Sequence, residues 1–161
     1  MIVGVISDTH GLVRPEAIEA LQGSELIVHA GDVGDARVLD HLRAIAPTIA
    51  VRGNVDTGQW AGALPITKVV DADGLQLYVL HDLATLDLDA RTAGFAAVIS
   101  GHTHRAHAEV KNGVLYLNPG SAGPRRFTLP ISLARIRVDH ARLSHEIIEL
   151  PVAASPRRPH A

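Results

Sequence analysis

Apolar positions follow two spacings over the first third of the chain. Short β-branched runs indicate buried strands, and apolar residues at helical spacing between them indicate helices. The expected elements are a strand over 2–7, a helix between Pro15 and Gly23, a strand over 26–28, a helix over 38–45 ended by Pro47, and a strand over 48–51. This order predicts parallel strands joined by right-handed crossovers.

The rest of the chain favours antiparallel hairpins. Their turn signals are Ala72-Asp73-Gly74 and Asn112-Gly113. The expected elements are strands over 66–71 and 75–80, a helix over 84–93, strands over 96–99, 106–111 and 114–117, and a last hairpin over 131–138 and 143–149. We therefore expect a single domain over residues 1–150 and a disordered tail over 151–161, which is rich in proline and arginine.

Composition excludes several classes of protein. A chain of 161 residues with 47% hydrophobic and 20% charged residues is typical of one soluble globular domain. Because there is no cysteine, neither disulfides nor thiolate metal sites are available. A net charge of −2 makes nucleic acid an unlikely partner, and no apolar run is long enough to cross a membrane. The N-terminus lacks the basic region of a signal peptide, so we expect a cytoplasmic protein.

Residues that can bind metal ions follow the ends of five expected strands. They are Asp8 and His10, Asp32, Asn54, His81, and His102 and His104. In open α/β sheets the ligand site lies beyond the carboxyl ends of the strands, so these side chains are expected to converge. Seven nitrogen and oxygen donors exceed what one tetrahedral zinc ion uses. They suit two ions that share a carboxylate.

Each of these motifs has a plainer interpretation when it is taken alone. Asp8-Thr9-His10 can be a capped turn, and Gly31-Asp32 and Gly53-Asn54 can be turns after strands. His81 can be an ordinary core or surface histidine. The pair His102-x-His104 forms a natural chelate, but such pairs also arise by chance in a chain with 10 histidines. The metal-site interpretation depends on the coincidence of all five strand ends.

The order of the motifs resembles the calcineurin-like metallophosphoesterases, and more narrowly the small prokaryotic YfcE-type phosphodiesterases. The resemblance covers residues 1–149 and rests on Ser7-Asp8-Thr9-His10-Gly11, His29-Ala30-Gly31-Asp32, Arg52-Gly53-Asn54, Gly101-His102-Thr103-His104 and Asn118-Pro119-Gly120-Ser121. It implies a four-layer α/β/β/α sandwich. It also implies that one divalent ion is held by Asp8, His10, Asp32 and His104, and a second by Asp32, Asn54, His81 and His102, with Asp32 bridging. Members of this branch commonly use Mn²⁺, and Ni²⁺, Co²⁺, Fe²⁺ or Zn²⁺ also suit these donors.

The resemblance implies hydrolysis of a small phosphodiester by a metal-activated hydroxide, with Asp32, Asn54 and His102 as catalytic residues. The alternative is a non-catalytic metal- or protein-binding scaffold of the same fold, because a retromer subunit related to this family has lost several ligands. Retention of all seven ligands favours the enzyme. A nuclease would want a larger chain and a basic track for DNA. Small relatives often associate, so we expect a homo-oligomer, either a dimer or a tetramer.

Two positions depart from the family pattern. Val55 stands where larger phosphatases have a histidine that helps protonate the leaving group. Asp82 follows His81 where the family usually has glycine, which suggests a positive φ at this position.

Several further residues are candidates for supporting roles. Arg105 and Arg125 could bind the phosphate, although arginines are usually solvated. His29 is expected to pack beside the site rather than to bind metal. The turn over 118–121 could be either a functional loop or a purely structural one.

Overall fold

Two five-stranded sheets form the protein, which is described by a computed structural model over residues 1–153. The first sheet has the order β10-β9-β1-β2-β3. Its strands are β1 (Ile2–Ile6), β2 (Leu26–His29), β3 (Thr48–Ala50), β9 (Ser132–Asp139) and β10 (Arg142–Glu149). β1, β2 and β3 are parallel, as the strand–helix alternation predicts. β9 pairs antiparallel with β1, and β10 pairs antiparallel with β9 at the edge of the sheet.

The second sheet has the order β4-β5-β6-β8-β7. Its strands are β4 (Thr67–Ala72), β5 (Leu75–Leu80), β6 (Ala97–Ile99), β7 (His107–Lys111) and β8 (Val114–Asn118). β5, β6 and β8 run parallel, and the two outer strands are antiparallel to their neighbours. The three predicted hairpins are therefore confirmed, with bounds shifted by about one residue, as is usual for strand ends.

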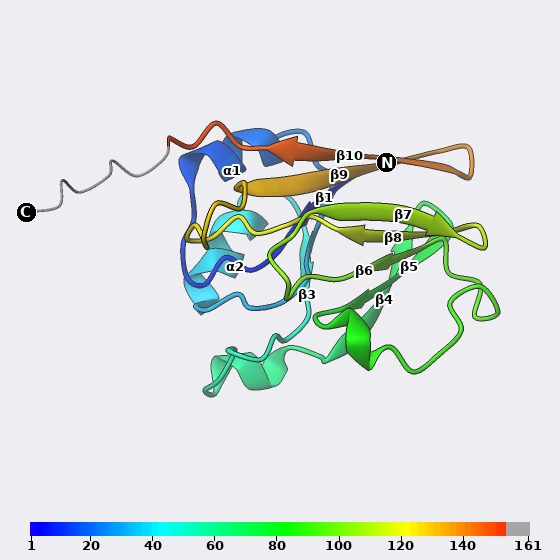
Figure 1. Cartoon of the computed structure of the whole chain (residues 1–161), viewed down its shortest axis with the longest axis horizontal. Coiled ribbons are helices and arrows are strands. Elements are labelled where there is room, and N and C mark those ends of the chain that lie inside the picture. The colour runs from blue at the N-terminus through cyan, green and yellow to red at the C-terminus, as the bar shows by residue number, and fades with distance from the viewer. Residues whose placement is uncertain (154–161) are drawn as a thin grey trace, which may run out of the picture.

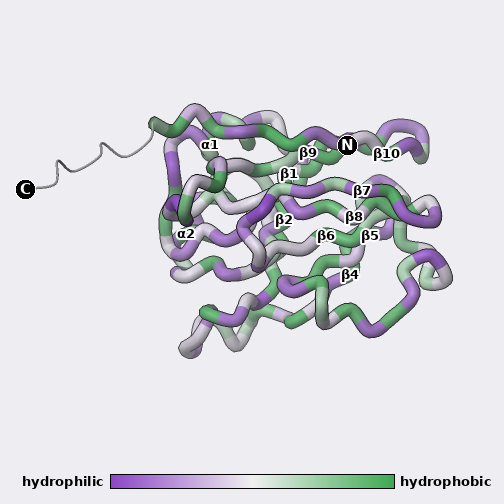
Figure 2. The backbone as a smooth tube through the Cα atoms, viewed as in Figure 1, coloured by the Kyte–Doolittle hydropathy of each residue, from purple (hydrophilic) through white to green (hydrophobic). Residues whose placement is uncertain are grey.

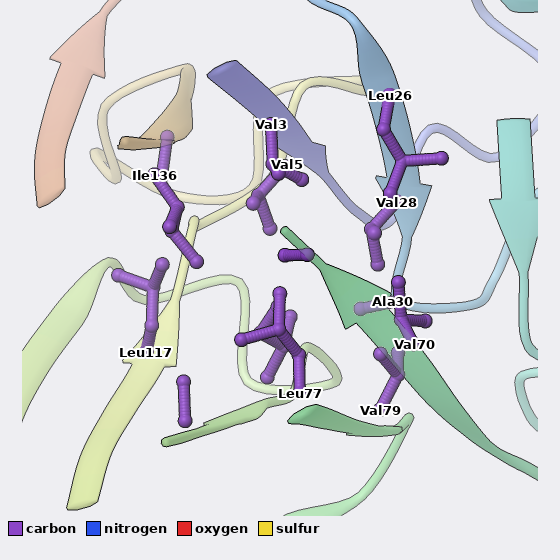
Figure 3. Close-up of a cluster of buried hydrophobic side chains, with 14 of the residues drawn as sticks. Val3, Val5, Leu26, Val28, Ala30, Val70, Leu77, Val79, Leu117 and Ile136 are labelled. Carbon is purple, nitrogen blue, oxygen red and sulfur yellow. The ribbon is translucent and has the colours of Figure 1, made fainter. Parts of the chain in front are cut away.

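The main core lies between the two sheets (Figure 3). Val3 and Val5 of β1 meet Leu77 and Val79 of β5 there. Alternate residues of a strand point to opposite faces, so Ile27 of β2 lies on the other side of the first sheet. Burial of both faces explains why β1 and β2 are continuous apolar runs instead of alternating ones.

Two short helices cover the outer face of the first sheet (Figure 1). They are α1 (Pro15–Leu21) and α2 (Ala36–Arg43), with Ala17, Leu21 and Leu42 among the residues they bury. Both helices connect parallel strands, which places the loops after β1 and β2 at the same edge of the sheet. In the part of the chain that the structure describes, no helix is long and apolar enough to span a membrane.

The outer face of the second sheet carries no helix over 84–93, so that prediction is wrong. The segment begins with a short 3-10 turn, η2 (Leu83–Thr85), and continues in non-helical turns. Leu86, Leu88 and Ala90 recur at every second position and pack onto the sheet, which an extended segment does better than a helix. A second 3-10 turn, η1 (Trp60–Ala63), links β3 to β4. The two-sheet α/β fold is confirmed, and its fourth layer is a loop with one turn of 3-10 helix.

The last hairpin ends in a polar turn, and the chain after it packs back onto the domain. Figure 2 shows the turn between β9 and β10 as largely hydrophilic. Beyond β10, Val152 packs against the helix-covered face of the first sheet. Arg125 Nη2 also donates to the carbonyl of Val152 at 3.2 Å. The packed domain therefore extends past the expected boundary at residue 150, and the prediction for 154–161 lies outside the described residues.

Candidate metal centre

The loops after five strand ends bring the predicted ligands together. Asp8 and Asp32 follow β1 and β2, and His81 follows β5. Atoms of these three side chains lie within 4.8 Å of one another, and the same is true of Asp8, His10 and His104. Asp8 belongs to both groups. The tertiary structure thus unites side chains as far apart in the sequence as Asp8 and His104.

Asp8 is fully buried, and its two oxygens have different surroundings. Oδ2 accepts hydrogen bonds from the Ser7 hydroxyl at 2.7 Å and from the His102 amide at 3.1 Å. Oδ1 has no hydrogen-bond partner among the described residues. It lies 3.4 Å from His104 Nε2 and 4.0 Å from the Nε2 atoms of His10 and His81. A buried carboxylate oxygen without a partner is costly, and a cation among these nitrogens would satisfy it.

Asp32 belongs to the group of Asp8 and His81, and it also approaches His10 of the other group. Its Oδ1 accepts a hydrogen bond from the Val55 amide at 3.0 Å. Its Oδ2 lies 3.2 Å from His81 Nε2 and 3.7 Å from His10 Nε2. One carboxylate oxygen therefore reaches a histidine from each ligand set that the family resemblance implies.

Asn54, His81 and His102 form a second cluster of donors. Asn54 Oδ1 lies 3.0 Å from His81 Nε2 and 3.3 Å from His102 Nδ1. The Nδ1 of His81 is 2.8 Å from the carbonyl of Ala30, to which it donates. In the neutral imidazole this bond leaves Nε2 with a free lone pair, the state that a metal ligand requires.

His104 is buried and has a second orphaned atom. Its Nδ1 has no hydrogen-bond partner among the described residues, and its Nε2 faces His10 Nε2 at 3.3 Å. Together with the unpartnered oxygen of Asp8, these contacts fit a cation held between the carboxylate and the imidazole nitrogens. The donors are oxygen and nitrogen without sulfur, which suits Mn²⁺, Fe²⁺, Co²⁺, Ni²⁺ or Zn²⁺.

The pKa values of the clustered groups move in opposite directions. Burial raises the pKa of Asp8, although its hydrogen bond with Ser7 works against this. Burial also raises the pKa of Asp32, but its contacts with His81 and the Val55 amide bring it below the usual value. The pKa of His81 is lowered by burial but raised more by Asp32, the Ala30 carbonyl and Asp8. Protons and metal ions compete for these donors, so metal binding is expected to weaken in acid.

Five of the seven candidate ligands have left-handed backbone conformations. Their φ angles are 54° at Asp8, 46° at His10, 54° at Asp32, 74° at His102 and 61° at His104. Non-glycine residues adopt this region at a cost of about 1–3 kcal/mol each and concentrate at functional sites. Such clustering is what a constrained metal site would require.

Asp82 does not have the positive φ that the glycine of the family suggested. Its φ is −110°, and its carboxylate caps η2 by accepting a hydrogen bond from the Ala84 amide at 3.0 Å. A side chain is therefore accommodated here without backbone strain, and the expectation of a positive φ is wrong. His81, the preceding residue, keeps its position in the cluster.

Asp56 supports two ligand loops, a role that the sequence analysis missed. Its buried carboxylate accepts hydrogen bonds from the amides of Val33 at 3.1 Å, Gly34 at 2.8 Å and Gly53 at 2.9 Å. These amides belong to the loops that carry Asp32 and Asn54. Its position two residues after Asn54 is the one sequence signal that points to it.

His29 packs beside the site and is outside both ligand groups, as predicted. Its Nδ1 accepts a hydrogen bond from the Gly31 amide at 3.1 Å. Its Nε2 therefore carries the proton and donates to Thr9 Oγ1 at 2.9 Å. Complete burial lowers the pKa of His29 to about 3, because the charged imidazolium would lose its hydration.

The Asn118–Ser121 turn makes hydrogen bonds to two loops that carry candidate metal ligands, the loop after β1 and the loop after β6. Asn118 Nδ2 donates to the Gly101 carbonyl at 2.9 Å and to Thr103 Oγ1 at 3.1 Å. Ser121 Oγ donates to the Asp8 carbonyl at 2.9 Å. Glycine is required at 101 because a Cβ there would clash with the side chains of Ser7 and Asp8. The contacts of the turn are structural, and they act on loops that carry ligands.

The two arginines proposed from sequence have different surroundings. Arg125 donates to the carbonyls of Leu129 and Val152, both at 3.2 Å, which gives it a structural role. Arg105 lines a cavity beside the Gly101–Ala106 loop. The charge of the neighbouring Arg126 acts on a candidate ligand: burial lowers the pKa of His104, Asp8 opposes this, and Arg126 lowers it further. No periodicity or motif in the sequence distinguishes Arg126 from Arg125.

The family model of the calcineurin-like phosphoesterase superfamily domain matches residues 1–141. The chain therefore belongs to this family. A probable metallophosphoesterase of Methanothermobacter thermautotrophicus is 34% identical over 160 residues, which is 92% of this chain and 92% of that protein. The resemblance inferred from the motifs is thus confirmed.

Two solved structures illustrate the range of proteins with this fold. A novel archaeal phosphodiesterase has a TM-score of 0.76 and 24% identity, covering 92% of this chain and 100% of that one. Vps29 from Entamoeba histolytica, complexed with Zn²⁺, has a TM-score of 0.71 and 22% identity, covering 92% and 99%. At these identities the similarity shows the fold alone.

Proposed function

We propose that this protein is a phosphodiesterase that uses two divalent cations, most naturally Mn²⁺. The observation that carries the proposal is the buried Oδ1 of Asp8, which has no hydrogen-bond partner among the described residues and faces three imidazole nitrogens. Asp8, His10, Asp32 and His104 would hold one cation. Asp32, Asn54, His81 and His102 would hold the other.

The side chains of the site would position the cations, and the carboxylates of Asp8 and Asp32 would offset part of their charge. When bound, such cations lower the pKa of water and offset negative charge on a phosphate. Asp32 would hold both, because its Oδ2 lies near His81 and His10. Asn54 and His102 would orient the cation on the exposed side, since the side chain of His102 is 44% exposed. Asp32, Asn54 and His102 are therefore our candidates for catalytic residues, because they would hold the cations that contact the phosphate.

A diester is our preferred substrate class because the archaeal protein with the same fold is described as a phosphodiesterase. Val55, which is 43% exposed, offers no proton for a leaving group, so an ester with a good leaving group is favoured. A small diester with a good leaving group is therefore the substrate that we propose, and self-association of the chain remains a prediction.

The non-catalytic scaffold is the competing function. Vps29 shares the fold and was crystallised with Zn²⁺, so binding of metal alone would not distinguish the two. Complete retention of the seven ligands supports hydrolysis, because a pure scaffold needs no bridging carboxylate or exposed histidine. Turnover is the property that separates them.

The test is hydrolysis by metal-stripped protein reloaded with Mn²⁺. Bis-p-nitrophenyl phosphate should be cleaved and p-nitrophenyl phosphate cleaved more slowly, whereas the Asp8→Asn variant should cleave neither. Asp71→Asn, which changes an exposed carboxylate on β4, is the matched control and should retain full activity. Absence of turnover with every divalent ion suited to these donors would favour the scaffold.

A further inference from the structure

A cavity of about 710 Å³ lies next to the exposed side of the metal centre. Gly101 and Thr103, the two neighbours of His102, both line it. Asp82 lines it as well, and its Oδ2 lies 3.9 Å from His102 Nε2. The cavity therefore begins directly beside a proposed metal ligand, whose side chain is itself 44% exposed.

The walls of the cavity are suited to an organic group rather than to an ion. Its apolar lining residues include Leu83, Ala84, Tyr116, Leu129, Pro130 and Ile147. Its volume falls within the range of about 300–1,000 Å³ that is usual for small-molecule sites. Water leaves such apolar walls readily when an apolar group replaces it. Arg105 and His107 also line the cavity and offer polar groups for orientation.

The end of the cavity nearest the metal centre is negatively charged, because Asp82 stands there next to His102. Glu149 and Arg105, which have opposite charges, also line the cavity. An anion placed beside Asp82 would be repelled, whereas an uncharged ring would not. A second phosphate directly beside the first is therefore disfavoured.

We propose that this cavity binds one ester group of the substrate, an uncharged aromatic or nucleoside-sized group, while the phosphate lies at the metal centre. This inference rests on the proposed phosphodiesterase function. It adds a substrate class: monophosphate diesters with one bulky, ring-containing alcohol. Phosphate held at His102 would direct that group past Asp82 and across the Gly101–Ala106 loop.

Two diesters with the same leaving group test the inference. Methyl p-nitrophenyl phosphate and 1-naphthyl p-nitrophenyl phosphate both release p-nitrophenolate, so a difference between them reports on the second ester group. With Mn²⁺-loaded protein, kcat/KM should be about 10-fold or more higher for the naphthyl ester, the discrimination that apolar pockets commonly provide.

Cavity-filling variants test whether the preference for the naphthyl ester arises in this cavity. Ala84 is exposed on the cavity wall, so Ala84→Trp should fill the space and reduce the naphthyl-to-methyl ratio towards one. Ala93→Trp is the matched control, because Ala93 is exposed on the same outer loop but does not line the cavity, and its ratio should equal that of the unmodified protein. Ile147→Trp fills the cavity from β10 and serves if Ala84→Trp does not fold.

The outcomes separate the inference from the function on which it rests. Equal kcat/KM for the two esters, or a preference that both tryptophan variants retain, would overturn the cavity assignment alone. Failure to cleave either ester would overturn the phosphodiesterase proposal and the cavity assignment together. A naphthyl preference that falls in Ala84→Trp or Ile147→Trp and persists in Ala93→Trp supports both.

Discussion

The Nε2 atoms of His10 and His104 lie 3.3 Å apart, although 94 positions separate the two residues in the chain. Two protonated imidazoles would repel each other at this distance, and both are close to Asp8 Oδ1, at 4.0 Å and 3.4 Å. A cation shared by the two nitrogens and the carboxylate oxygen accounts for all three contacts.

Metal content is the first prediction. Mn²⁺-reconstituted protein should contain two ions per chain, with a separation of ~3.5–4 Å in a crystal. Asp32→Asn should lose tight binding of the pair and most activity, because one carboxylate lies near a histidine of each ligand set. Elemental analysis after gel filtration measures the ions. Asp40→Asn, an exposed change on α2, is the control. Near-normal metal content and turnover in Asp32→Asn would contradict the two-ion centre.

The second prediction concerns Asp56, which joins the loops that carry Asp32 and Asn54. Asp56→Asn puts an amide donor in place of one oxygen that accepts backbone hydrogen bonds, and each unsatisfied buried amide costs about 1–3 kcal/mol. Urea unfolding should show a loss of this size, and the Mn²⁺ concentration for half-maximal activity should rise. Asp87→Asn, at an exposed position, should change neither quantity. An unchanged Mn²⁺ requirement in Asp56→Asn would remove its assigned role in positioning the ligands.

Val55 leads to the third prediction. A general acid typically contributes ~10²–10⁴-fold when it protonates a departing oxygen, and valine cannot act as one. Esters of p-nitrophenol, whose anion needs little protonation, should therefore be cleaved much faster than alkyl diesters. The measurement is the dependence of rate on the pKa of the leaving group, with chemistry shown to limit the rate. A flat dependence would mean that another residue donates the proton.

A substitution at the same position extends this test. The side chain of Val55 is 43% exposed, and its amide, which every residue except proline retains, makes the hydrogen bond to Asp32. Val55→His should thus fold normally and reduce the leaving-group dependence, chiefly by accelerating alkyl esters. Val55→Gln is the control for size and polarity, because its side chain donates no acidic proton.

Burial of His29 predicts a loss of stability in acid. The pKa of this residue falls from 6.5 to about 3 on folding because burial removes the hydration of the charged ring. The unfolded chain therefore binds the extra proton between these values, and stability present above pH 6.5 is lost as the pH falls towards 3. His29 should contribute a loss of about 2 kcal/mol at pH 5 relative to pH 7.5 in metal-free protein.

The comparison that isolates His29 uses one substitution at two pH values. Urea unfolding of His29→Gln should give a smaller decrease in free energy between pH 7.5 and 5 than the unmodified protein does. His41→Gln, which removes an exposed histidine on α2, should keep the original decrease. If His29→Gln shows the same pH dependence as the unmodified protein, the neutral buried state of His29 is not what links stability to pH.

Much of the fold could be predicted because strand signals are local. Apolar runs at β1, β2 and β5 identify buried strands, and turn residues such as Asn112-Gly113 identify hairpins. The prediction of a helix over 84–93 is wrong because packing against the second sheet determines the conformation of this segment. The alternate spacing of Leu86, Leu88 and Ala90 matters only once the second sheet provides a surface to cover.

The sequence by itself determined the candidate ligands, because each of the seven follows the carboxyl end of a strand and parallel strands present those ends at a common edge. Only the tertiary structure decided how they meet. The free oxygen of Asp8, the support from Asp56, the unstrained backbone of Asp82 and the structural role of Arg125 all depend on contacts between distant segments. Periodicity places a residue on an element, but distances between loops arise only when the two sheets pack together.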